Sequence, residues 1–160
     1  MPADLLSLIL DGPFELQKRP EPLPGDLRLA WGIALVVLLL GCSRRKQASL
    51  QKLHLLAHSA RTRETRRDAE RLFNGALSPA AFVVRFEPWL NRALAFSKAA
   101  GLVDFERGKS AKLTTEGVAT FDKLNKDEGL LAEEKSFISS IAPLATERNV
   151  DKIMRMETLF

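Results

Sequence analysis

The sequence predicts a mainly α-helical fold with a small β-hairpin. Apolar residues recur at helical spacing through most of the 160 residues. One short stretch near residue 105 instead alternates apolar and polar side chains on both sides of a glycine-containing turn. The composition, 46% hydrophobic and 28% charged, is that of one ordinary globular domain and excludes a disordered chain.

In the first 25 residues, a short apolar run is followed by four prolines. Prolines at this density prevent a continuing helix, so residues 1–25 are predicted to form an extended N-terminal arm. The leucines of the arm need an apolar surface to cover them, either on this domain or on a partner. The predicted partner-binding residues are Leu5, Leu6, Leu8, Ile9 and Leu10.

Three helices are predicted after the arm. The first runs from about Leu27 to Leu40 after Asp26 as its cap, and because it is apolar nearly all round it should be central. The second starts with Ser49 as cap and buries one apolar stripe. The third covers about residues 64–74 and shows four arginines to solvent or to a partner, namely Arg63, Arg66, Arg67 and Arg71.

The second half is expected to begin with a strand over residues 81–85 and a helix from Pro88 to Gly101. A hairpin follows, formed by residues 102–106 and 111–114 around a basic tip. Thr114 is placed to cap a helix that stops near residue 127, and two more helices are expected over about residues 130–143 and 150–156.

This order of elements is that of a winged helix-turn-helix domain with additional N- and C-terminal helices. The residues that carry the prediction are Ala100-Gly101-Leu102-Val103 and Leu113-Thr114-Thr115-Glu116-Gly117. Gly101 allows a left-handed exit from the helix, and Thr114 satisfies amide groups at the start of the next one. The predicted organisation is an arm over 1–25, a winged-helix domain over 26–127 and a C-terminal helical extension over 128–160.

The uncharged run from Leu29 to Cys42 is shorter than the roughly 20 apolar residues that span a membrane, so a core helix is expected. Its end, Leu39-Leu40-Gly41-Cys42, is similar to a lipoprotein cleavage box. A signal peptide begins with a basic stretch, whereas acidic and proline-rich residues precede this segment. A lipid-anchored protein is therefore disfavoured. A single cysteine leaves no internal disulfide, and the expected location is the cytoplasm, without membrane contact.

No catalytic or metal-binding signature is found in the sequence. His54 and His58 have a spacing that can bind zinc, but no third ligand is evident and the residues between them lack the glutamate of the metalloprotease motif. Phosphate-binding glycine loops and nucleophile elbows are also missing. We therefore expect no enzyme, no cofactor and no metal.

The charge is unevenly distributed. Residues 42–112 carry 15 Lys and Arg against 6 Asp and Glu, whereas residues 113–160 have a net charge of −3. Such a basic middle suits nucleic acid or an acidic protein, although the alternative of a solvated helix face stays open. The predicted nucleic-acid-binding residues are Arg63, Arg66, Arg67, Arg71, Arg92, Lys98, Arg107, Lys109 and Lys112.

Three stretches resemble the middle component of bacterial ABC-three-component systems, which include the Lamassu antiphage group. They are Ala30-Trp31-Gly32-Ile33-Ala34-Leu35-Val36-Val37-Leu38-Leu39-Leu40, then Ser49-Leu50-Gln51-Lys52-Leu53-His54-Leu55-Leu56-Ala57, then residues 99–117. The resemblance implies a non-catalytic subunit that works with an SMC-like ABC ATPase and an effector subunit, usually a nuclease.

Two functions are therefore expected from the sequence. The first is a winged-helix adaptor of such a complex, engaged in antiviral defence. It contacts double-stranded DNA as part of the complex and couples DNA sensing to the effector. The alternative is a dimeric winged-helix transcription regulator, in which the helix from Pro88 reads an operator. That helix offers few of the Arg, Lys, Asn or Gln side chains that read bases.

Overall fold

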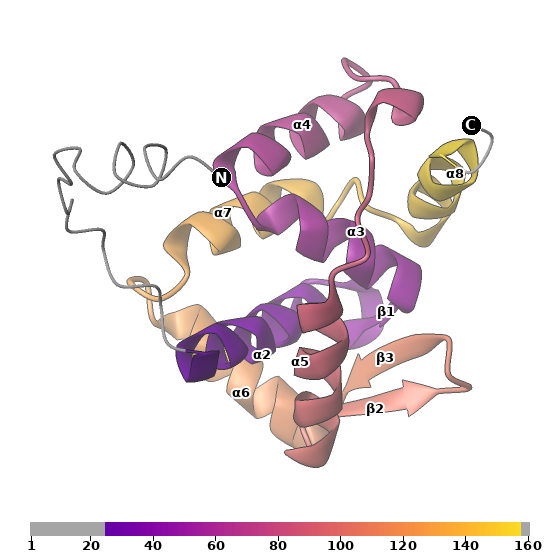
Figure 1. The fold of residues 1–160 in the computed structure, drawn as a ribbon. Coiled ribbons are helices and arrows are strands. Elements are labelled where there is room, and N and C mark those ends of the chain that lie inside the picture. Colours follow the sequence, from indigo (N-terminus) through magenta and orange to yellow (C-terminus); the bar gives the residue numbers. More distant parts are fainter. Residues whose placement is uncertain (1–24, 158–160) are drawn as a thin grey trace, which may run out of the picture.

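The computed structural model describes residues 25–157, which form a mainly helical body with one small antiparallel sheet (Figure 1). The predicted arm and its residues Leu5 to Leu10 lie outside the described residues. The elements are α2 (Gly25–Gly41), η1 (Arg44–Lys46), β1 (Gln47–Ser49), α3 (Leu50–Ala60), α4 (Arg63–Phe73), η2 (Pro79–Ala81), α5 (Pro88–Ala99), β2 (Val103–Glu106), β3 (Ser110–Leu113), α6 (Thr115–Lys126), α7 (Ala132–Ile141) and α8 (Glu147–Glu157).

Helix α2 is the centre of the core, as its uniformly apolar sequence predicted. Residues 35–40 are all buried, and the helix contacts α3, α5, α6 and α7. No helix among the described residues is both long and apolar enough to cross a membrane.

The end of α2 is closed by its neighbours. The Nζ atom of Lys46 donates a hydrogen bond of 2.7 Å to the carbonyl oxygen of Gly41 and lies 4.2 Å from the centre of the Phe121 ring. A cation at this end of a helix complements the negative end of its dipole. Lys46 therefore links α2 to α6.

The sheet contains a strand that the sequence did not predict. Its order is β1-β3-β2, with β3 in the middle and antiparallel to both neighbours. The hairpin of β2 and β3 matches the predicted one, while β1 pairs Ala48 with Ala111, both buried. Just before β1, Arg45 and Lys46 have positive φ values of 58° and 57°, a conformation that is uncommon outside glycine.

The connection from the hairpin into α6 follows the predicted chemistry. Gly101 has φ +72° where the chain leaves α5. The hydroxyl of Thr114 accepts a hydrogen bond of 3.0 Å from the amide of Gly117 and donates one to the carbonyl of Gly101. These bonds fix the start of α6 against the start of the hairpin.

The predicted strand over residues 81–85 is wrong. Residues 79–81 form η2, and residues 82–87 run as an extended segment that pairs with no strand of the described part of the chain. The β-branched and aromatic composition favoured extended backbone correctly, but a strand also needs a neighbour to pair with.

Helices α7 and α8 belong to the same core as the rest. Phe137, Ile138 and Ile141 of α7 and Val150 and Ile153 of α8 are buried within one continuous apolar cluster with α2 and α3. The predicted division at residue 127 therefore marks no separate core. Helix α7 contacts α2, α3 and α4, whereas α8 contacts α3 and η2 (Figure 1).

Candidate nucleic-acid interface

The tip of the hairpin presents predicted phosphate-binding residues to solvent. Arg107, Lys109 and Lys112 are all exposed. Arg107 and Gly108 both have positive φ, 52° and 66°, as in the tight turns that match the twist of a hairpin. The carbonyl of Lys109 accepts a hydrogen bond of 3.0 Å from the amide of Leu50, so the base of α3 fixes the position of the tip.

Two further cations lie close to the hairpin. Arg44 and Arg45 are exposed on η1, which contacts β3. The acidic residues of the hairpin are Asp104, which lies opposite Lys112 in the register, and Glu106, which accepts a hydrogen bond of 2.7 Å from Gln47. The hairpin and η1 together thus present five exposed cations against two carboxylates.

Arg44 and Arg45 were missed as site residues by sequence reasoning. In the sequence, Ser43-Arg44-Arg45-Lys46 directly follows the apolar segment, and no pattern around it indicates a neighbouring hairpin. Their place beside the hairpin depends on β1, a strand of three residues that pairs with β3 across more than 60 positions of sequence.

Helix α5 offers a sparse surface for reading bases. Its buried side consists of Leu90, Ala93, Leu94 and Ser97, while Asn91, Arg92 and Lys98 are exposed. The Nζ atom of Lys98 lies 5.4 Å from the centre of the Phe105 ring, so this cation leans toward the hairpin. Phe96 is 49% exposed on the same helix, which suits contact with protein better than contact with phosphates.

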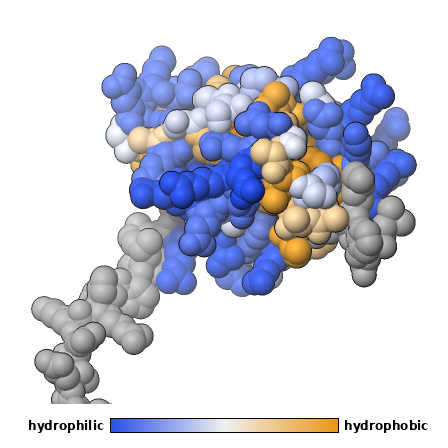
Figure 2. Space-filling view, turned by 90° about the horizontal axis from the view of Figure 1, so that it is seen from above, coloured by the Kyte–Doolittle hydropathy of each residue, from blue (hydrophilic) through white to orange (hydrophobic). Residues whose placement is uncertain are grey.

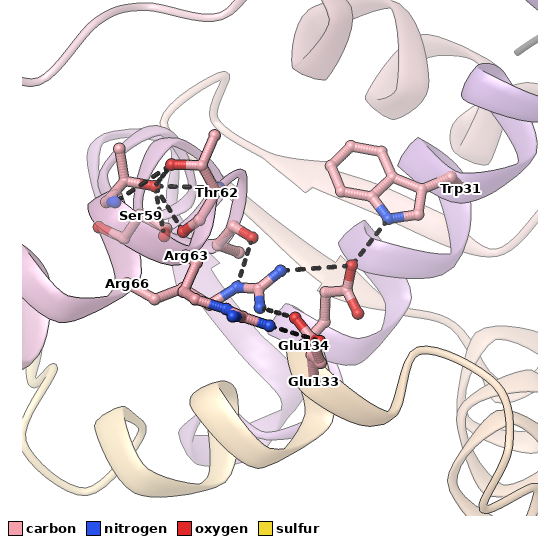
Figure 3. A network of polar contacts seen from close by, with 9 residues as sticks. Trp31, Ser59, Thr62, Arg63, Arg66, Glu133 and Glu134 are labelled. Atoms are coloured by element: carbon pink, nitrogen blue, oxygen red, sulfur yellow. Dashed lines mark hydrogen bonds and ion pairs between the residues drawn. The ribbon is translucent and has the colours of Figure 1, made fainter. Parts of the chain in front are cut away.

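Arg66 on α4 is a structural residue rather than a free cation. Its side chain is only 15% exposed and lies at the junction of α4 and α7 (Figure 3). It donates a hydrogen bond of 3.0 Å to the carbonyl of Ala60 and one of 2.6 Å to a carboxylate oxygen of Glu133. Its guanidinium also lies 3.7 Å from a carboxylate oxygen of Glu134. Glu134 also accepts a hydrogen bond of 3.2 Å from the indole of Trp31. Hydrogen bonding and the charge of Arg66 hold the pKa of Glu133 below its usual value.

Two of the other arginines of α4 lie beside carboxylates. Arg63 lies 3.6 Å from Glu133, and Arg71 lies 3.6 Å from Asp68. Arg67 lines a shallow groove of about 450 Å³ between α4 and α7. The four arginines of α4 face five carboxylates, which are Glu64, Asp68, Glu70, Glu133 and Glu134. This surface therefore carries charges of both signs, whereas the hairpin and η1 carry mainly positive charge.

Replacing Arg66 should destabilise the protein far more than replacing Arg63. In Arg66→Ala, the carbonyl of Ala60 loses a hydrogen bond and Glu134 loses the nearby positive charge in a mostly covered position, which we expect to cost about 2 kcal/mol. In Arg63→Ala, a side chain that is 78% exposed is removed, and the stability should hardly change. Urea unfolding of both variants measures the difference, and equal midpoints would contradict the structural role of Arg66.

Two histidines of α3 hold the extended segment 82–87 in place. The Nδ1 atom of His58 lies 3.3 Å from Glu87, which also accepts a hydrogen bond of 3.0 Å from Arg61. The ring of His54 contacts the ring of Phe86 edge-on, with 4.8 Å between the ring centres. The Nδ1 atom of His54 is buried without a hydrogen-bond partner. Burial lowers the pKa of His54, opposed by Asn91 and Glu87. The spacing of the two histidines therefore serves packing here, and no group of three or more metal-binding side chains occurs among the described residues.

The lowered pKa of His54 predicts a loss of stability at mildly acidic pH. Below about 6.5 the unfolded chain binds a proton at this histidine that the folded chain resists. The stability contributed by neutral His54 is thus complete above that pH and falls as the pH is lowered. Urea unfolding between pH 7.5 and 5.5 should show this fall, and the dependence should be weaker in His54→Gln; an identical dependence in both proteins would contradict the prediction.

Cys42 is a half-buried thiol at the end of α2. Burial raises its pKa, and the nearby charge of Lys46 only partly opposes this. The thiol is therefore held in its protonated, weakly nucleophilic form.

Comparison with known proteins finds no matching protein family, no matching curated protein and no matching solved structure.

Proposed function

We propose that this chain is a non-catalytic winged-helix adaptor of an SMC-like ABC ATPase complex that acts in cytoplasmic antiviral defence. In this role it couples the binding of double-stranded DNA by the complex to the activity of an effector subunit such as a nuclease. The observation that carries the proposal is the exposed basic hairpin beside a helix, α5, that has little capacity to read bases. Phosphate contacts add affinity without sequence information, which suits a sensor of DNA as such.

The strand order and the helix order support the winged-helix part of the proposal. In a winged helix, a first helix precedes an edge strand, and the helix before the hairpin lies next to it. Here α2 precedes β1, α5 leads directly into β2, and β3 lies between β1 and β2. Helix α4, inserted between α3 and α5, and the helices α7 and α8 exceed what a minimal DNA-binding domain requires.

The proposed DNA surface consists of the hairpin and η1, flanked by Arg92 and Lys98 of α5. Five cations on neighbouring elements can follow a phosphate backbone, while Lys98 lies where α5 and the hairpin meet. The proposed surface does not include helix α4, because Arg63 and Arg71 lie beside carboxylates and Arg66 is mostly covered.

The proposed contact with the ATPase uses apolar side chains. Exposed Phe96 offers one such contact on α5, and the leucine-rich arm offers another. An aromatic side chain at an interface buries a large area at small entropic cost.

Selection of binding sites from random duplexes separates the adaptor from an operator-reading regulator. We expect the purified protein, and the complex that contains it, to enrich no palindromic sequence and to bind random duplex with a strong dependence on salt. Enrichment of one palindrome by the isolated homodimer would overturn the adaptor and favour the regulator.

A further inference from the structure

The turn that joins α2 to β1 carries three basic residues whose surroundings differ. Arg44 and Arg45 are exposed, whereas Lys46 is only partly exposed. The Nζ atom of Lys46 donates its hydrogen bond of 2.7 Å to the carbonyl of Gly41 and lies 4.2 Å from the centre of the Phe121 ring. The ammonium group of Lys46 is thus engaged by α2 and α6, while the two arginines are accessible to a ligand.

The backbone of this turn has a conformation that residues other than glycine rarely adopt. Arg45 and Lys46 have consecutive positive φ values of 58° and 57°. Such a conformation costs free energy and persists only where surrounding contacts hold it. The side chain of Lys46 provides contacts of this kind, and its amide closes the turn with a hydrogen bond of 3.0 Å to the carbonyl of Ser43. The turn is therefore fixed before any ligand binds.

The other end of the turn is tied to the hairpin. The side-chain amide of Gln47 donates hydrogen bonds of 2.7 Å to Glu106 and 3.0 Å to the hydroxyl of Ser110. Gln47 lies opposite Lys112 in the register, so η1 lies at the Lys112 end of β3, away from the tip of the hairpin. The arginines of η1 therefore extend the row of cations that begins at the tip.

This row of cations is suited to a chain of phosphates. Neither Arg44 nor Arg45 forms an ion pair with another described residue. Figure 2 shows a contrasting surface at the end of the molecule where η2 and α8 lie, with an apolar patch between charged side chains. Phosphates are attracted by cations rather than by apolar groups, and side chains that are held in place before binding lose less entropy when they bind.

We propose that Lys46 is a positioning residue of the DNA surface. Its contacts with α2 and α6 hold Arg44 and Arg45 in line with the hairpin, so that both arginines contact the same phosphate backbone as the hairpin does. This inference rests on the proposed function. Lys46 acts through the two arginines and not through its own charge, because its ammonium group is engaged by Gly41 and Phe121.

The salt dependence of DNA binding separates positioning from a simple loss of charge. It is measured by fluorescence anisotropy of a random-sequence duplex with the purified complex. Replacing both arginines, Arg44→Ala with Arg45→Ala, should lower the slope of log affinity against log salt by about 1.8, or 0.9 for each lost phosphate contact. Lys46→Met should lower the slope by at least about 1 and weaken binding about tenfold near 0.1 M salt. In the chain that already lacks both arginines, Lys46→Met should change the slope no further.

Further variants identify the anchor as the cause. Lys126→Met removes the same charge from an exposed position at the end of α6 and should leave the slope unchanged. Lys46→Arg retains a cation that can donate to a carbonyl and stack on an aromatic ring, so it should retain most of the slope. Lys46→Gly suits the positive φ and removes the anchor without backbone strain, so it replaces Lys46→Met in the comparison if that variant does not fold.

The outcomes distinguish this inference from the proposed function. A slope that is retained without the Lys46 side chain, or that Lys126→Met lowers equally, would overturn the positioning role and leave the hairpin as the DNA surface. An unchanged slope in the double alanine variant would overturn it as well, because the two arginines would then contact no phosphate. If the unmodified complex bound no DNA, the proposed function would fail together with this inference.

Discussion

Reversing the three charges of the hairpin, Arg107→Glu, Lys109→Glu and Lys112→Glu together, should weaken DNA binding by at least about 100-fold near 0.1 M salt. Each cation that meets a phosphate releases a counterion, so the slope of log affinity against log salt should also fall, by about 0.9 for each phosphate that is no longer neutralised. The three side chains are exposed and form no ion pair with the rest of the described chain, so the fold should tolerate the change. Fluorescence anisotropy of a random-sequence duplex with the purified complex measures both quantities.

The matched control places the same change of charge on α4. Arg63→Glu, Arg67→Glu and Arg71→Glu alter the net charge by the same amount but lie among the carboxylates of α4 and α7. Arg66 is retained because it supports the fold. We expect a loss of less than about tenfold, from long-range electrostatics alone. If this variant lost as much affinity as the hairpin variant, the assignment of the DNA surface to the hairpin would be wrong.

Gly117→Ala should destabilise the protein by about 3 kcal/mol. A Cβ atom at this position would lie 2.0 Å from the carbonyl oxygen of Leu102 and 3.1 Å from the side chain of Leu113. The carbonyl of Leu102 cannot move away easily, because it accepts a hydrogen bond of 3.0 Å from the amide of Thr114. The substitution thus forces α6 away from the base of the hairpin.

The control for this variant is Gly129→Ala. A Cβ atom on Gly129 would approach only a side-chain oxygen of Asp127, at 3.6 Å, so the stability should change by less than about 0.5 kcal/mol. Urea unfolding, followed by circular dichroism, compares the two. A Gly117→Ala protein as stable as the unmodified one would contradict the close approach of α6 to residue 102.

Local chemistry explains which parts of the fold could be predicted. The start of α3 at Ser49 and of α6 at Thr114 follows from side-chain oxygens that accept a hydrogen bond from the amide three residues on. The central place of α2 follows from its apolar surface. The missing strand β1 and the wrong strand at 81–85 share one cause: pairing is decided by tertiary neighbours, and three to five residues carry too little pattern to indicate them.

The charges of the candidate site show the same limit. An exposed hairpin tip is a local feature, so its cations could be named from the sequence. The partner of Arg66, by contrast, is a glutamate 67 residues away on α7, and no pattern along the chain indicates that it is close. The sequence therefore grouped the arginines of α4 with those of the hairpin, whereas the ion pairs of α4 separate them.

The adaptor role itself is tested most directly by quantitative mass spectrometry of what co-purifies with the tagged full chain expressed from its own operon. We expect a stoichiometric SMC-like ABC ATPase together with an effector subunit. Recovery of the chain alone, as a monomer or a homodimer, would contradict the account.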